Sequence, residues 1–172
     1  CRASSQGGHD YRDDVAKALG LEQSDVRVHV KDIGGGFGAK GTVSEEEVVV
    51  AQLARLTGRP VRWTESRTEN LIGYVHGRAQ KQRVTMGGTR DGRITTYRLE
   101  VVQDCGAYPL WGPFLPEFTR QMACGVYDIA EVEYSAKSVA TNTAPVTAYR
   151  GAGRPEATAA IERAVDMFAA EI

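Results

Sequence analysis

Two glycine-bearing stretches hold the residues best able to do chemistry in this chain. The first is "IGGGFGAKGT" (33–42), which follows the alternating stretch "VRVHV" and precedes an expected helix. The second is "TAYRGAGRPEA" (147–157), in which Arg150 and Arg154 surround glycines directly before another expected helix. Glycine lets backbone approach a bound group closely, and exposed N–H and guanidinium groups bind anions. Both stretches are therefore candidate anion-binding loops.

The first loop does not match a nucleotide phosphate loop. That motif reads G-x-x-x-x-G-K-[ST], so that backbone N–H groups surround the phosphates and a hydroxyl reaches Mg²⁺. Here Ala39 precedes Lys40, and Gly41 follows it. Two required positions therefore fail.

A dinucleotide-binding turn is a more serious alternative. Gly34, Gly36 and Ala39 satisfy G-x-G-x-x-[GA], and Glu65 closes a second expected strand further on. In such a turn the helix begins within the glycines, whereas Ser44 is the expected cap here. A glycine turn without any ligand is the other alternative for this loop. The second loop, taken alone, is equally compatible with a solvated turn.

The elements that must position these loops are mixed. Helices are expected over 10–20, 44–57, 66–73 and 155–172, the second of them beginning at the capping-box pair Ser44 and Glu47. Strands are expected over 26–30, 61–63, 79–87, 93–104 and 131–139, with a hairpin turn at Asp91-Gly92. The pattern predicts an α+β fold of antiparallel strands packed with helices.

Apolar side chains on these elements indicate which faces are buried. Tyr97, Leu99 and Val101 alternate along one strand, as a half-buried strand requires. Two helical stripes are expected to face a core, and they comprise Val49, Leu53 and Leu56, and Ile161, Val165, Phe168 and Ile172.

Composition narrows the class of protein. The chain has 172 residues, is 42% hydrophobic and 25% charged, and carries a formal net charge of −1, which gives no reason to expect nucleic acid or an anionic membrane as partner. Cys1, Cys105 and Cys124 form no Cys-x-x-Cys pair, which favours free thiols and a cytoplasmic location. The three histidines lack metal-ligand spacing, so no protein-ligated metal is expected.

Together the two loops resemble a known family. "GGGFGAK", followed later by "AYRGAGRPE" and preceded by "SSQGGHDYRDDVAKALGL", is similar to the large, molybdenum-binding subunit of the xanthine dehydrogenase, aldehyde oxidase and carbon monoxide dehydrogenase family. The resemblance runs along essentially all 172 residues. It implies that residues 1–172 are a fragment of the molybdopterin-binding domain, truncated at both ends.

The resemblance also implies site residues. Gln6 falls where the family places a glutamine that donates a hydrogen bond to an oxo ligand of molybdenum, and Arg150 falls where a loop arginine lies beside the active site. These two are the expected catalytic residues. The expected cofactor-binding residues are Gly35, Gly36, Phe37, Gly38, Arg150 and Gly151.

Two departures from the family pattern bear on substrate. Gly41 stands where purine-oxidising members carry a glutamate, so purine hydroxylation is disfavoured. Gly151 stands where carbon monoxide dehydrogenases carry a copper-binding cysteine, so "AYRGAGR" is similar to the copper-free, form II relatives. The resemblance therefore implies oxidation of an aldehyde or an N-heterocycle, with water as the oxygen source.

The same resemblance implies cofactors and partners. The full-length protein is expected to hold molybdopterin with molybdenum, as the cytosine dinucleotide, and to work with iron–sulfur and FAD-binding subunits or domains. The family's catalytic glutamate belongs to a motif absent from this chain, so the isolated chain is expected to be inactive and to bind no cofactor. The alternatives are a Rossmann-like oxidoreductase domain and a non-catalytic interaction module.

Overall fold

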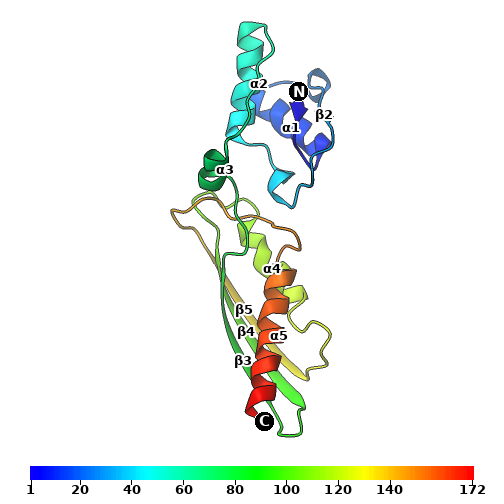
Figure 1. Cartoon of the computed structure of the whole chain (residues 1–172), viewed down its shortest axis with the longest axis vertical. Coiled ribbons are helices and arrows are strands. Elements are labelled where there is room, and N and C mark those ends of the chain that lie inside the picture. Colours follow the sequence, from blue (N-terminus) through cyan, green and yellow to red (C-terminus); the bar gives the residue numbers. More distant parts are fainter. The chain divides into compact units, whose positions relative to one another are not determined.

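The computed structural model describes all 172 residues, which divide into two compact units, Cys1–Tyr74 and Val75–Ile172. The α-helices and strands of the first unit are β1 (Arg2–Ala3), α1 (Gly8–Leu19), β2 (His29–Val30), α2 (Glu45–Thr57) and α3 (Arg67–Gly73) (Figure 1). The second contains β3 (Gln80–Gly88), β4 (Ile94–Asp104), α4 (Leu115–Gln121), β5 (Glu131–Val139) and α5 (Arg154–Glu171). The α+β class is confirmed.

The helices of the first unit lie where they were predicted, although α1 begins at Gly8 rather than at Asp10. The Ser44 hydroxyl accepts a hydrogen bond from the Glu47 N–H group, and the Glu47 carboxylate accepts one from the Ser44 N–H group at 2.9 Å. The same reciprocal cap joins Ser66 to Glu69 at the start of α3. Gly20 ends α1 with a φ of 63°, a left-handed conformation that glycine adopts readily.

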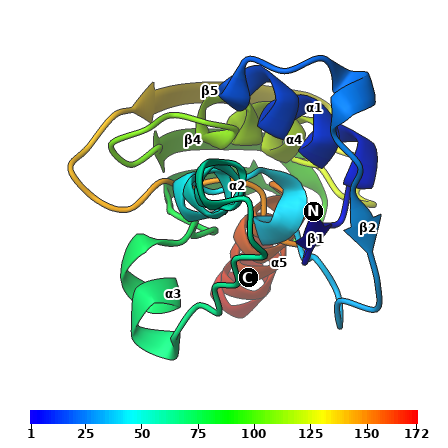
Figure 2. The ribbon, with the colours of Figure 1, turned by 90° about the horizontal axis from the view of Figure 1, so that it is seen from above.

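The strands of the first unit are shorter than predicted. Only His29 and Val30 of the expected strand over 26–30 form β2, and they pair in parallel with Arg2 and Ala3 (Figure 2). Residues 61–63 form no strand. Alternation over so few residues is a weak signal for a strand. Whether such a segment forms a strand also depends on a neighbouring strand with which it can pair.

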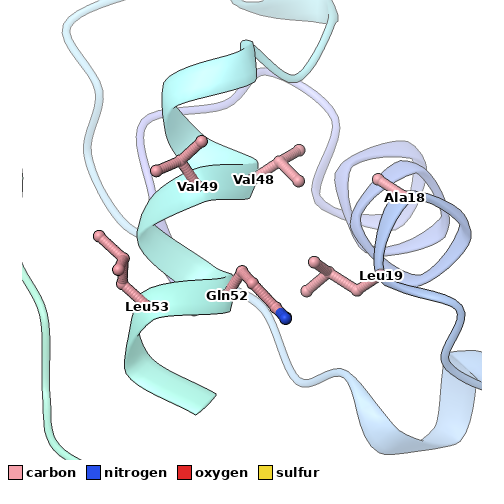
Figure 3. Close-up of a pocket in the computed structure, with 6 residues that line it drawn as sticks. All are labelled: Ala18, Leu19, Val48, Val49, Gln52 and Leu53. Atoms are coloured by element: carbon pink, nitrogen blue, oxygen red, sulfur yellow. The ribbon is translucent and has the colours of Figure 1, made fainter. Parts of the chain in front are cut away.

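The predicted apolar stripe on α2 is exposed rather than buried. Val49, Leu53 and Leu56 are 55%, 44% and 73% exposed, whereas Ala51 packs against the core formed by Tyr11 and its neighbours on α1. Val49 and Leu53 line an open groove between α1 and α2, together with Ala18, Leu19, Val48 and Gln52 (Figure 3). Within this chain the helix therefore buries a different face from the one that its apolar residues mark.

The second unit is built on a three-stranded sheet in the order β3-β4-β5. β3 and β4 form the predicted antiparallel hairpin, which turns through Asp91 and Gly92, and Gly92 has a φ of 92°. β5 pairs in parallel with β4, with Leu99 opposite Tyr134. The expectation of antiparallel strands is wrong for β5. A parallel neighbour needs a crossover, and the segment containing α4 supplies it.

The core of the second unit lies between this sheet and α5, which runs along one face of it (Figure 1). Tyr97, Leu99 and Val101 are at most 3% exposed and pack against Ala160 and Ile161 of α5. The predicted stripe on α5 is correct at Ile161 and wrong at its end, where Ile172 is 46% exposed. No helix in the structure has both the length and the apolar character that crossing a bilayer requires.

Candidate functional site

Gln6 lies against the first glycine loop through both its backbone and its side chain. Its N–H group donates to the Lys40 carbonyl at 3.0 Å, and its side-chain oxygen accepts from the Gly38 N–H group at 3.0 Å. A backbone N–H group can only donate, so this contact assigns Oε1 to the atom facing Gly38. The amide Nε2 then keeps two N–H donors that no acceptor in the chain claims.

The loop itself is a tight turn with unusual backbone conformations. The φ angles of Gly34, Gly35, Phe37 and Gly38 are 66°, 105°, 57° and 96°. A positive φ at Phe37 is uncommon for a residue with a side chain, and such strain persists only where the surroundings impose it. The N–H groups of Gly35, Gly36 and Phe37 donate to no acceptor within the chain. The turn therefore offers free donors to a ligand.

The loop itself requires glycine at residues 35 and 36. A β-carbon at Gly36 would lie 2.6 Å from Cβ and 2.9 Å from Cδ of Gln6. A β-carbon at Gly35 would lie 2.6 Å from the Phe37 ring. Glycine at these two positions thus leaves room for the side chains of Gln6 and Phe37. It also permits the close approach of a ligand that was expected from the sequence.

Two further side chains hold the loop in place. The Lys40 ammonium donates to the Ile33 carbonyl at 2.7 Å, which closes the turn. The Tyr74 hydroxyl donates to the Ala39 carbonyl at 2.7 Å, and burial, with Glu47 and Glu65 nearby, raises the pKa of Tyr74 to about 12. Tyr74 therefore stays protonated as a donor at neutral pH.

Gly41 lies next to the Gln6 amide. A β-carbon at residue 41 would lie 3.5 Å from Nε2 of Gln6, which is ordinary van der Waals contact. Residue 41 has no positive φ, so a side chain there would meet no backbone strain. The position that sequence reasoning tied to substrate choice thus adjoins a predicted catalytic residue.

The second loop positions Arg150 before α5. Gly151, Ala152 and Gly153 have φ angles of 97°, 42° and 85°, and the Ala152 N–H group donates to the Tyr149 carbonyl at 2.7 Å. The Arg150 side chain is exposed and forms no ion pair or hydrogen bond within the chain. Its guanidinium group therefore keeps its donors available.

Sequence reasoning missed the residues that fasten this second loop. Arg78 forms an ion pair with Glu156 at 2.9 Å, donates to the backbone carbonyl of Arg150, and lies 4.9 Å from the centre of the Tyr149 ring. Glu156 in the first turn of α5 offered a weak signal, because acidic residues favour that position. Nothing in the sequence around Arg78 indicated such a role.

The predicted site residues thus form two groups. Gln6 lies with the glycine loop in the first unit, and Arg150 lies with Gly151 in the second. The groove between α1 and α2 is lined by no titratable side chain and by none of the predicted catalytic or cofactor-binding residues (Figure 3). Helix α2 begins at Glu45, well after the glycines, and the largest sheet has three strands, so the dinucleotide-binding alternative is wrong.

Comparison with known proteins identifies the family. The sequence model of the molybdopterin cofactor-binding domain matches residues 1–172. The 6-hydroxypseudooxynicotine dehydrogenase complex subunit gamma of Paenarthrobacter nicotinovorans is 38% identical over 165 residues, which are 95% of this chain and 21% of that protein. The carbon monoxide dehydrogenase large chain of Hydrogenophaga pseudoflava is 36% identical over 173 residues, which are 98% of this chain and 22% of that protein.

A solved structure agrees with these relatives. Quinoline 2-oxidoreductase from Pseudomonas putida 86 superposes with a TM-score of 0.88 at 33% identity, over 96% of this chain and 22% of that one. The chain spans about a fifth of the length of each of these three relatives. The chain belongs to the molybdopterin cofactor-binding domain family, as found in the large subunits of molybdenum hydroxylases.

Proposed function

We propose that this chain supplies one wall of the molybdenum cofactor site in a large subunit that hydroxylates an N-heterocycle or an aldehyde, with water as the oxygen source. The observation that carries the proposal is the orientation of Gln6. Its carbonyl oxygen is held by Gly38, so its amide N–H donors, which lie beside Gly41, have no acceptor within the chain. An amide donor suits an oxygen ligand of a metal.

The first glycine loop fits an anionic pterin cofactor. Three successive N–H groups, of Gly35, Gly36 and Phe37, lack acceptors within the chain. Successive free N–H groups in a turn with positive φ form a concave anion-binding surface. Gly35, Gly36, Phe37 and Gly38 would therefore hold the cofactor through their backbone. When bound, the molybdenum cofactor supplies the two-electron oxidation, and the protein orients it.

Arg150 acts on the substrate side in this proposal. Its exposed guanidinium group has no partner in the chain and can donate to an electronegative atom of the substrate. Donors aimed at charge that develops in the transition state lower the barrier. Gly151 beside it has no side chain, which leaves room for substrate and provides no thiolate for copper.

The substrate class follows from the residues at two positions. Gly41 lacks the carboxylate that resemblance associates with purine binding, and Gly151 lacks the copper-binding thiol. The first departure disfavours xanthine as the substrate, and the second disfavours carbon monoxide. Quinoline, named for the solved relative, is an N-heterocycle, and this supports an N-heterocycle ahead of an aldehyde.

Further partners belong to the same proposal. The complete enzyme would carry the cofactor as the cytosine dinucleotide, and would pass electrons to iron–sulfur and FAD-binding subunits or domains. The three cysteines of this chain are unpaired, which supports a cytoplasmic location. The chain alone would be inactive, because the family's catalytic glutamate does not occur in it.

The test is a substrate screen of the full-length enzyme with a dye acceptor. Quinoline, an aromatic aldehyde, xanthine and carbon monoxide would be compared by kcat/KM, with molybdenum content measured on the same preparation. Turnover of quinoline or the aldehyde, with little activity on the other two, would support the proposal. A preparation that retains no molybdenum, or that turns over xanthine or carbon monoxide fastest, would overturn it. An interaction module without catalysis predicts no turnover of any substrate.

A further inference from the structure

Arg78 makes three contacts on one short segment of the second unit. One guanidinium nitrogen, Nη1, donates to the Glu156 carboxylate at 2.9 Å, and the other, Nη2, donates to the backbone carbonyl of Arg150. The guanidinium group also lies 4.9 Å from the centre of the Tyr149 ring. The guanidinium group of arginine presents its N–H donors in a fixed planar fork, so it can bind a carboxylate and a carbonyl while it lies over an aromatic ring.

The segment that carries Arg78 is itself fixed against the second loop. The His76 N–H group donates to the Pro145 carbonyl at 2.9 Å, and the Thr147 N–H group donates to the His76 carbonyl at 2.8 Å. A β-carbon at Gly77 would lie 2.5 Å from Cβ of Tyr149, so this close approach requires glycine. These contacts bring two segments that are distant in sequence side by side.

Arg78 also has a strained backbone. Its φ is 66°, although it is not glycine. Such a conformation is unfavourable for a residue with a side chain and persists when surrounding contacts impose it. Its partner, the Glu156 side chain, is only 7% exposed, and a carboxylate so buried requires a positive partner. The site is therefore a specific arrangement rather than an incidental surface ion pair.

We propose that Arg78, held by Glu156, is a positioning residue for Arg150. By fixing the Arg150 carbonyl, it sets the direction in which the Arg150 side chain leaves the loop. This inference rests on the proposed role of Arg150 in catalysis for its effect on activity, although its effect on the loop does not depend on that role.

The loop arm of the test uses trypsin, which cleaves after Arg150 when the loop opens. The double variant Arg78→Met, Glu156→Gln removes both charges together, so no buried carboxylate is left unpaired. Cleavage at the bond between Arg150 and Gly151, followed by mass spectrometry, should accelerate about tenfold, because cleavage follows the population of the open loop. The control Arg98→Ala breaks an exposed ion pair with Glu133 on the sheet and should leave that cleavage rate unchanged. Unchanged cleavage in the double variant would overturn the inference.

The activity arm uses the full-length enzyme and a double-mutant comparison. With Arg150 present, the Arg78→Met, Glu156→Gln variant should lower kcat more than it raises KM. In an Arg150→Ala background the same pair of changes should have no further effect, because Arg78 acts through Arg150. If the paired changes instead lower kcat by the same factor in the Arg150→Ala background, the positioning role is overturned. Faster loop cleavage in the double variant, together with full activity of the Arg150→Ala variant, would support the contact between Arg78 and the loop and refute the proposed role of Arg150.

Discussion

The side-chain oxygen of Gln6 accepts a hydrogen bond from the Gly38 N–H group at 3.0 Å, and the Gln6 side chain fills the space that a side chain at residue 36 would occupy. This relationship links the start of the chain to the glycine loop and fixes which end of the amide is free. Both the proposed cofactor contact and the proposed catalytic contact depend on it.

Replacement of Gly36 by alanine should therefore displace Gln6. The new β-carbon would lie 2.6 Å from Cβ of Gln6, which is too close for two side chains to coexist. In the full-length enzyme, kcat/KM should fall about tenfold or more, because the amide donor no longer faces the cofactor. The matched control is Gly73→Ala, where a β-carbon meets no atom within 4 Å. Equal kcat/KM of both variants would show that the position of Gln6 does not depend on glycine at residue 36.

Introduction of a carboxylate at residue 41 should change substrate preference. A Gly41→Glu side chain would start 3.5 Å from Nε2 of Gln6 and would need no strained backbone. We expect kcat/KM for xanthine to rise relative to quinoline, because the carboxylate can accept hydrogen bonds from a purine. Gly41→Ala, which adds only the β-carbon, separates the effect of charge from that of volume. If Gly41→Glu leaves the ratio of the two substrates unchanged, residue 41 does not determine specificity.

Removal of the Arg150 guanidinium group should lower catalysis without unfolding the loop. Arg150 forms no ion pair within the chain, so the Arg150→Ala variant breaks no internal contact of that side chain. We expect a loss of roughly 10²-fold in kcat/KM, or about 2.7 kcal/mol of transition-state stabilisation. Arg90→Ala in the exposed hairpin turn is the control and should keep full activity. A loss confined to KM would instead assign Arg150 to ground-state binding.

Acid should weaken the second unit through Asp104. Its carboxylate accepts hydrogen bonds from the Gly106 N–H group at 2.8 Å and the Thr141 hydroxyl at 2.7 Å, which hold its pKa below the ordinary value. The folded pKa lies below the unfolded one, so this stabilisation is complete above the ordinary aspartate pKa of about 4. It is lost as pH falls toward the lower folded value.

The variant Asp104→Asn tests that dependence. Urea unfolding of the chain between about pH 6 and pH 3 should show a lower free energy of unfolding for the variant at pH 6 and a smaller loss on acidification. Asp128→Asn, which removes an exposed carboxylate without a hydrogen bond in the structure, is the control. Parallel pH curves for wild type and Asp104→Asn would contradict the assignment.

Local sequence signals predicted the features that depend on neighbouring residues. The capping residue Ser44, the terminating Gly20, and the turn at Asp91-Gly92 are confirmed because each acts within a few residues. Pairing of β5 with β4 was not predictable in this way. Its parallel direction follows from the crossover segment that contains α4, a helix that was not predicted from the sequence.

The candidate site shows the same division between local and distant information. The glycine loop and "AYRGAGR" could be identified from sequence because their residue types are unusual over a short span. The contact of Arg78 with Glu156 joins residues 78 positions apart, and neither lies in an unusual pattern. The exposed stripe on α2 differs for another reason, since periodicity identifies an apolar face but not what covers it.

The most direct test of the central claim replaces Gln6 by glutamate in the full-length enzyme. The two side chains have the same shape, and glutamate can still accept from the Gly38 N–H group, so the loop contact is preserved while the free amide donors are lost. Gln23→Glu, an exposed change in the same unit, is the control. The measurement is kcat/KM with quinoline, together with molybdenum per subunit. We predict that Gln6→Glu keeps its molybdenum and loses about 10²-fold in kcat/KM, whereas Gln23→Glu loses neither. Wild-type kcat/KM in a molybdenum-replete Gln6→Glu enzyme would contradict the claim that this chain places an amide donor in the cofactor site.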